Sequence, residues 1–164
     1  MDHAAFRIFY EKTVPALRAY AIRSCGSVDF ADDILQEAFL RFLKSAPVAT
    51  LSEAQMRSYL YRTVESLIVN HWRLFQRERK LMQETGNNPT RNSPEMADDM
   101  TRAFSQLDPK QRSLLWLAYV EGFDHKEIAA TANIQEKSVR VLLYRARQTL
   151  MGILKSAGLG PEVL

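Results

Sequence analysis

Residues 108–154 read DPKQRSLLWLAYVEGFDHKEIAATANIQEKSVRVLLYRARQTLMGIL, and this stretch decides the fold of the C-terminal half. Asp108, which is followed directly by proline, predicts a helix N-cap with proline at the first helical position. Asp124 and Glu127 have the spacing of a capping box, which predicts the start of a short second helix. After a three-residue turn, apolar residues recur at helical spacing over 136–155. A short helix, a tight turn and a longer basic helix are typical of a helix-turn-helix module.

The long basic helix separates into two faces when its residues are spaced about 100° apart. Its core-facing stripe consists of Val139, Leu142, Leu143, Ala146, Leu150, Ile153 and Leu154. The opposite face offers cations for phosphates, donors for base edges and an apolar group for a thymine methyl. That face consists of Lys137, Arg140, Val141, Tyr144 and Gln148. The alternative is an amphipathic helix with a solvated basic face, but the preceding short helix and turn, in which Asn133 tolerates left-handed backbone, favour a DNA reader.

The rest of the chain also predicts helices, because apolar residues recur at three- and four-residue spacing instead of alternating. We therefore expect an all-α fold. Pro15 lies within the first predicted helix and should kink it or break it in two. A stretch rich in Gly, Asn and Pro has almost no apolar content, which is typical of a flexible linker. The predicted helices cover 4–23, 29–44, 52–80 and 94–107, and two small helical domains (1–82 and 96–157) flank the linker 83–95.

Composition excludes several classes of protein. The single cysteine, Cys25, cannot form an intrachain disulfide, and the three histidines lack the spacing of metal ligands. No cofactor or metal is expected, and no Ser, His and acidic residues recur in a catalytic arrangement, so we do not expect an enzyme. The N-terminus has no signal pattern and no run reaches membrane-spanning length, so we expect a cytoplasmic protein without membrane insertion.

Two further helical faces carry polar side chains. On the helix 52–80 an apolar stripe is expected to be buried, and it consists of Met56, Leu60, Val64, Leu67, Ile68, His71, Leu74 and Phe75. Beside it, arginines, small polar groups and an aromatic could follow a nucleic-acid backbone and hold an unstacked base; they are Tyr59, Arg62, Ser66, Asn70, Arg73 and Arg77. On the preceding helix an acidic face with an exposed leucine suits a basic protein partner, or is a plain surface; it consists of Asp32, Asp33, Gln36, Glu37, Leu40 and Lys44.

In order and spacing these pieces resemble one family, the bacterial extracytoplasmic-function (ECF) sigma factors of the sigma-70 family. The second-region signature of that family resembles residues 32–42 (DDILQEAFLRF) and 58–63 (SYLYRT). Its fourth-region signature resembles residues 107–112 (LDPKQR), 119–123 (YVEGF), 127–129 (EIA) and 138–146 (SVRVLLYRA). The resemblance extends over about residues 6–154.

The resemblance implies a protein that binds core RNA polymerase and directs promoter-specific initiation, with an anti-sigma protein as a further expected partner. It implies that Asp32, Asp33, Gln36, Glu37 and Leu40 dock on the polymerase. It implies that the locally melted minus-ten element meets Tyr59, Arg62, Ser66, Asn70, Arg73 and Arg77. It also implies that the double-stranded minus-thirty-five element meets Lys137, Ser138, Arg140, Val141, Tyr144, Arg145 and Gln148.

Four positions and one loop depart from the family pattern. The loop 45–52 usually carries aromatic, glycine and acidic residues, and here it reads SAPVATLS. Family members usually have tryptophan at Tyr59, asparagine at Ser66 and aspartate at Asn70, so the minus-ten sequence read here is expected to differ. Gln135 replaces the usual serine cap of the last helix, which should weaken its start by about 1 kcal/mol. Two other functions stay open: a sigma-like mimic that titrates an anti-sigma protein, and a helix-turn-helix regulator that acts without core polymerase.

Overall fold

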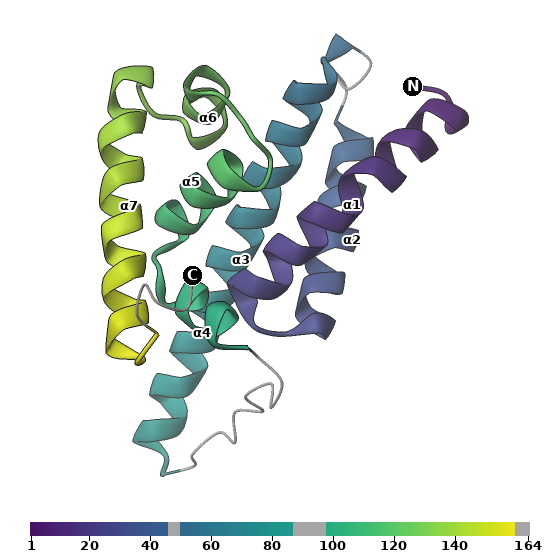
Figure 1. Cartoon of the computed structure of the whole chain (residues 1–164). Helices are drawn as coiled ribbons and strands as arrows, with labels where there is room; N and C mark the ends of the chain where they lie inside the picture. Colours follow the sequence, from purple (N-terminus) through teal and green to yellow (C-terminus); the bar gives the residue numbers. More distant parts are fainter. Residues whose placement is uncertain (46–49, 87–97, 160–164) are drawn as a thin grey trace.

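The computed structural model describes residues 1–45, 50–86 and 98–159. Within these ranges the chain is helical, which confirms the all-α prediction. Figure 1 shows α1, α2 and α3 as one group of helices, with α5 and α6 packed against α3, α4 packed against α1, and α7 outside α5 and α6. The helices are α1 (His3–Cys25), α2 (Val28–Lys44), α3 (Glu53–Glu84), α4 (Asp99–Gln106), α5 (Pro109–Tyr119), α6 (His125–Ala132) and α7 (Glu136–Ser156).

Side-chain caps start the helices where the sequence places them. Ser52 and Gln55 form the predicted capping box of α3, and Asp124 and Glu127 form that of α6. The Asp108 carboxylate accepts a hydrogen bond from the backbone N–H of Gln111 at the start of α5, and a proline lies in the first turn of this helix. These side-chain bonds satisfy backbone N–H groups that have no partner inside the helix.

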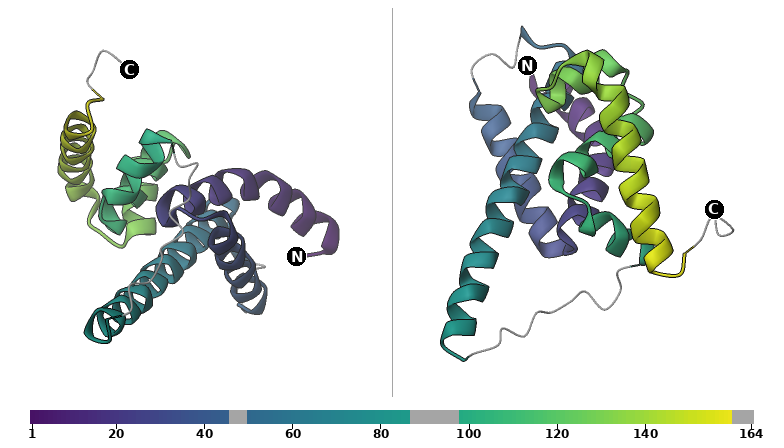
Figure 2. Two further views of the ribbon diagram at one scale, coloured as in Figure 1. Left: turned by 90° about the horizontal axis from the view of Figure 1, so that it is seen from below. Right: turned by 90° about the vertical axis from the view of Figure 1, so that its left-hand side faces the viewer.

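Two expectations are corrected. Pro15 was expected to kink its helix or break it in two, and it lies inside a single helix, α1, so the break does not occur. Leu74 was expected to be buried but is 56% exposed. Leu74 belongs to the C-terminal half of α3, and Figures 1 and 2 show the C-terminal part of this helix extending beyond the other helices. The predicted linker lies largely outside the described residues, since 87–97 are not described, and the domain boundaries stay a prediction.

The two groups of helices share one hydrophobic core. We call α1–α3 the N-terminal unit and α4–α7 the C-terminal unit. Aromatic side chains connect them: the ring of Tyr20 lies 5.5 Å from Tyr61, 5.5 Å from Trp116 and 6.4 Å from Phe104. Burial of such large aromatic surfaces, with edge-to-face or tilted geometry, stabilises the contact between the units. The two predicted helical units are therefore present, and they pack directly against each other.

Candidate nucleic-acid and polymerase interfaces

The recognition helix α7 presents the outer face that its phase predicts. Asn133 ends α6 with φ of 55°, the left-handed conformation expected of the turn. Val139, Leu143 and Ala146 are buried against α5 and α6, which fixes the rotation of α7. The opposite side chains are exposed, namely Lys137, Arg140, Val141, Tyr144, Arg145 and Gln148, and Ser138 is half-buried.

The cations of this face are available to a partner. Within the described ranges, Lys137, Arg140 and Arg145 take part in no ion pair with the chain itself. Val141 is 50% and Tyr144 is 56% exposed, so an apolar and an aromatic group stand among the charges. Arg147, in contrast, is directed toward α5, where it donates to the Tyr119 hydroxyl at 2.6 Å. The α7 outer face thus has the groups that phosphate and base-edge contacts require.

Three of the predicted minus-ten residues line one open cavity. Tyr59, Arg62 and Ser66 surround a space of about 380 Å³ together with Thr63 and with Arg41 from the end of α2. The Tyr59 ring is half-buried against Phe42, at 5.9 Å between ring centres. Asn70, Arg73 and Arg77 continue the same face of α3 and are exposed. The sequence did not single out Arg41; only its position at the end of α2, four residues after Glu37, could have indicated it.

The acidic face of α2 is exposed, and part of its charge is paired within the chain. The Glu37 carboxylate accepts a hydrogen bond from Arg41 at 2.8 Å, and the Asp32 carboxylate accepts one from Arg18 at 2.8 Å. The hydrogen bond from Arg18 lowers the pKa of the Asp32 carboxyl. Such exposed ion pairs contribute little stability, about 0–1 kcal/mol, and can exchange partners. Asp33, Gln36 and Leu40 are exposed beside them, and Asp33 forms none of the ion pairs found in the described residues.

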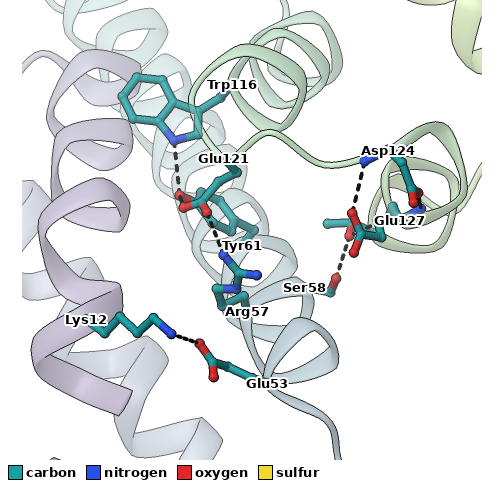
Figure 3. A network of polar contacts seen from close by, with 10 residues as sticks. Lys12, Glu53, Arg57, Ser58, Tyr61, Trp116, Glu121, Asp124 and Glu127 are labelled. Atoms are coloured by element: carbon teal, nitrogen blue, oxygen red, sulfur yellow. Dashed lines mark hydrogen bonds and ion pairs between the residues drawn. The ribbon is translucent and has the colours of Figure 1, made fainter. Parts of the chain in front are cut away.

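A polar cluster between the two units was not predicted from the sequence. After α5 the chain turns at Gly122, whose φ of 68° favours glycine, and this turn directs Glu121 toward α3. Figure 3 shows the Glu121 carboxylate between Arg57 at 3.1 Å and the Tyr61 hydroxyl at 2.5 Å. The indole N–H of Trp116 donates to the same hydroxyl at 3.0 Å.

A second bond between the units lies along the same helix. The hydroxyls of Ser58 on α3 and Thr131 on α6 are 2.6 Å apart. Below Glu121, the guanidinium of Arg57 lies over the buried Phe123 ring at 5.2 Å. We call Arg57, Ser58, Tyr61, Trp116, Glu121 and Thr131 the interdomain cluster. Each of its hydrogen bonds between the units joins residues more than fifty positions apart in the chain, so no local pattern reveals it.

Burial changes the pKa of two acidic side chains on α3, Tyr61 and Glu65. It raises the pKa of the Tyr61 hydroxyl, an effect reinforced by the hydrogen bond to Glu121. It also raises the pKa of Glu65 on α3, against the opposing influence of the Ser113 hydroxyl and the Arg112 charge. Both Ser113 and Arg112 belong to α5, so Glu65 also responds to the contact between the units.

The described residues contain no group of three or more His, Cys, Asp or Glu side chains arranged to hold a metal ion. None of the helices in these ranges is long and apolar enough to cross a membrane.

Comparison with known proteins places both units in one family. Residues 9–78 match the model for Sigma-70 region 2, and residues 97–150 match the model for Sigma-70, region 4. The ECF RNA polymerase sigma factor SigL of Mycobacterium tuberculosis is 24% identical over 96% of this chain and 93% of its own length. The ECF RNA polymerase sigma factor EcfG of Rhodopseudomonas palustris is 26% identical, over 91% and 86%.

A solved structure has the same fold. The sigma factor RpoE in complex with the anti-sigma factor NepR, from Bartonella quintana, superimposes with a TM-score of 0.63 at 20% identity, covering 92% of this chain and 97% of that one. The two family models, the similar sigma factors and the shared fold agree with the order of the signatures along the sequence. The chain therefore belongs to the ECF sigma factors of the sigma-70 family, which direct RNA polymerase to promoters.

Proposed function

We propose that three faces of this chain divide the work of a sigma factor. The acidic face of α2 binds core RNA polymerase, the polar face of α3 holds the melted minus-ten strand, and the outer face of α7 reads the minus-thirty-five duplex. The observation that carries this proposal is the α7 outer face, whose cations are exposed and free of ion pairs within the described chain. The chemistry of RNA synthesis belongs to the polymerase, and no residue of this chain is proposed as catalytic.

Arg140 tests the proposed duplex contact. Because its side chain is exposed on the α7 outer face, Arg140→Ala should weaken minus-thirty-five binding by about 1–3 kcal/mol if the guanidinium contacts a base edge. Arg147→Ala is the matched control, since Arg147 is directed toward Tyr119 and should leave binding nearly unchanged. The assay is titration of labelled duplex promoter with the chain bound to core polymerase. Unchanged binding by Arg140→Ala, together with an intact fold in Leu143→Ser, would show that the helix is phased wrongly.

The α3 cavity supports the contact with a melted strand. An aromatic ring beside two arginines suits stacking of an unpaired base and neutralisation of its phosphates. Tyr59→Ala should weaken binding of single-stranded minus-ten DNA by about 1–3 kcal/mol, the value of one stacked base. Tyr59→Phe should retain binding, because it keeps the ring and loses only a long 3.5 Å bond to the Arg41 carbonyl. Equal loss in both variants would argue against stacking.

The acidic face of α2 supports the contact with polymerase. Asp33→Arg with Glu37→Arg reverses two exposed charges and should abolish copurification with core polymerase. Glu11→Arg with Asp99→Arg reverses two exposed acids elsewhere, each in an ion pair within its own helix, and should not. Copurification that survives the first pair of changes would exclude this face as the docking surface.

We also propose regulation by an anti-sigma protein, since the sigma factor RpoE of similar fold was crystallised with the anti-sigma factor NepR. The alternative of a sigma-like mimic is not favoured, because a mimic has no use for the free cations of α7. A regulator that acts without polymerase is not favoured either, since the region 2 model matches the N-terminal unit.

A further inference from the structure

Among the described residues that line the α3 cavity, Arg41 alone comes from another helix, α2. It lies there with Tyr59 and Arg62, beside the hydroxyls of Thr63 and Ser66. The volume of about 380 Å³ falls within the roughly 300–1,000 Å³ of sites that hold small organic groups. No carboxylate and no carboxamide belongs to this described lining. The cavity therefore offers one aromatic ring, two guanidinium groups and two hydroxyls.

The guanidinium of Arg41 is oriented by a contact on one side. Its Nε donates to the Glu37 carboxylate at 2.8 Å, one helical turn earlier in α2. Within the described part of the chain, its two terminal nitrogens, Nη1 and Nη2, donate to no other residue. Because the guanidinium is planar, a bond at Nε restricts the direction in which the terminal pair points. A fork restricted in this way loses less entropy when it binds two matching acceptors.

The second arginine of the cavity, Arg62, has no such restraint. It is exposed, and it takes part in none of the ion pairs found in the described residues. It also lines a neighbouring cleft of about 260 Å³, so its side chain borders two open spaces at once. An unrestrained cation suits a phosphate, which accepts from many directions and carries no sequence information. Arg41 and Arg62 are therefore suited to different parts of a nucleotide.

The donors of this cavity match guanine better than the other bases. The edge that guanine presents in the major groove of duplex DNA carries two neighbouring acceptors, O6 and N7, which a bidentate arginine matches. On the corresponding edge, adenine combines an acceptor with a donor and is read by carboxamides, while cytosine offers a donor that is read by carboxylates. Neither kind of group belongs to the described lining. Thymine offers one acceptor beside a methyl group, so it leaves half of the arginine fork without a partner.

We propose that Arg41 reads an unpaired guanine in the α3 cavity, with the base stacked on Tyr59 and its O6 and N7 accepting from Nη1 and Nη2. Arg62 neutralises a phosphate of the same strand. Arg41 thus determines specificity, and Arg62 contributes affinity for any sequence. This proposal rests on the proposed function, because it names the base that the polar face of α3 selects from the melted strand.

The first experiment lets the protein choose its strand. Single-stranded DNA of random sequence is mixed with the chain bound to core polymerase, and the bound strands are sequenced. The wild type should enrich guanine at one position. Arg41→Lys keeps the charge and loses the planar fork, so strands should still bind while that enrichment disappears. Arg62→Ala should keep the enrichment, weaken binding of all strands about equally and reduce the salt dependence of binding.

The matched control is the same kind of ion pair on another helix. Arg7 and Glu11 are also four residues apart and lie 3.0 Å from each other, on the exposed surface of α1. Arg7→Lys should enrich the same guanine to the same extent as the wild type. Circular dichroism and copurification with core polymerase check that each variant is folded and bound before its strands are compared.

The second experiment changes the base and leaves the protein as it is. At the enriched position, guanine is replaced by 7-deazaguanine, which lacks the N7 acceptor, or by hypoxanthine, which keeps O6 and N7 and lacks the 2-amino group. The wild type should bind the 7-deazaguanine strand about 5- to 150-fold more weakly, the discrimination of one bidentate base contact. It should bind the hypoxanthine strand as well as the guanine strand. Arg41→Lys should bind all three strands equally.

The outcomes separate this inference from the proposed function. Equal binding of guanine and 7-deazaguanine by the wild type would overturn the assignment of Arg41, as would enrichment of another base or an enrichment that Arg41→Lys retains. In those cases the polar face of α3 still binds the melted strand, and the proposed function stands. If the wild type enriches no base and Tyr59→Ala binds single strands as well as the wild type, the proposed contact of α3 fails and the assignment of Arg41 fails with it.

Discussion

The start of α7 offers a test in which the sequence and the structure make the same prediction. Six of the seven helices described have a side-chain cap, from Asp2, Ser27, Ser52, Asp98, Asp108 and Asp124, and α7 has none. Gln135 already has the extended backbone of an N-cap, with φ of −74° and ψ of 138°. Gln135→Ser should therefore place a hydroxyl at the first turn without moving the backbone.

The expected gain in stability depends on the hydrogen bonds that the first turn of α7 already forms. A new serine cap commonly stabilises by about 0.5–2 kcal/mol. Here the Ser138 N–H already bonds to the Gln135 carbonyl at 2.9 Å, so the hydroxyl would share an amide that is partly satisfied. We therefore expect the lower part of that range, about 0.5–1 kcal/mol. For a chain of this size the melting temperature should rise by about 1–4 °C.

The assay is urea and thermal unfolding followed by circular dichroism, with Gln135→Ala as the control. Since the glutamine side chain makes no cap bond, Gln135→Ala should lie within a few tenths of a kcal/mol of the wild type. Slower hydrogen exchange at the first amides of α7 should accompany the serine variant. If Gln135→Ser is no more stable than Gln135→Ala, the reasoning that α7 lacks a usable cap is refuted.

Three further predictions concern stability. Leu60→Ala, at a fully buried site of α3, should lower the free energy of unfolding in urea by about 2–5 kcal/mol. Leu74→Ala, at a site on the same helix that is 56% exposed, should stay within about 0.5 kcal/mol of the wild type. Similar losses in the two variants would contradict the burial described. Arg112→Met should destabilise the chain by about 1.5–3 kcal/mol for each hydrogen bond lost. The reason is that the buried guanidinium donates to the Leu107 carbonyl at 2.9 Å and so joins α4 to α5. An unchanged free energy of unfolding would show that water takes the place of the guanidinium at this carbonyl. Because burial raises the pKa of Glu65, the free energy of unfolding of the wild type should fall as pH rises from the unfolded pKa of Glu65 through its folded pKa. Glu65→Gln should flatten that fall and be the more stable form at pH 7. An unchanged pH profile would contradict the shift.

The sequence predicts the features that depend on neighbours in the chain. The boxes Ser52–Gln55 and Asp124–Glu127, and the left-handed Asn133, each need only a few adjacent residues, and all three are confirmed. The rotation of α7 follows from the same logic, because a stripe of seven apolar residues has one way to face a core. The buried set Val139, Leu143 and Ala146 confirms it.

What the sequence cannot predict depends on which element lies opposite. The apolar stripe of α3 continues past His71, but Leu74 in that continuation is 56% exposed, and Figure 1 shows the C-terminal part of α3 extending beyond the other helices. Tyr61 lies off that stripe and is buried, because Trp116 and Glu121, more than fifty residues away, cover it. The helical spacing of apolar residues assigns a residue to one face of a helix. It does not say how far along the helix other elements pack against that face.

The weak start of α7 bears on how this chain binds DNA. Core polymerase, by holding both units, would raise the effective concentration of α7 near its duplex. A recognition helix without a side-chain cap then needs little affinity of its own, since the polymerase supplies the second point of attachment.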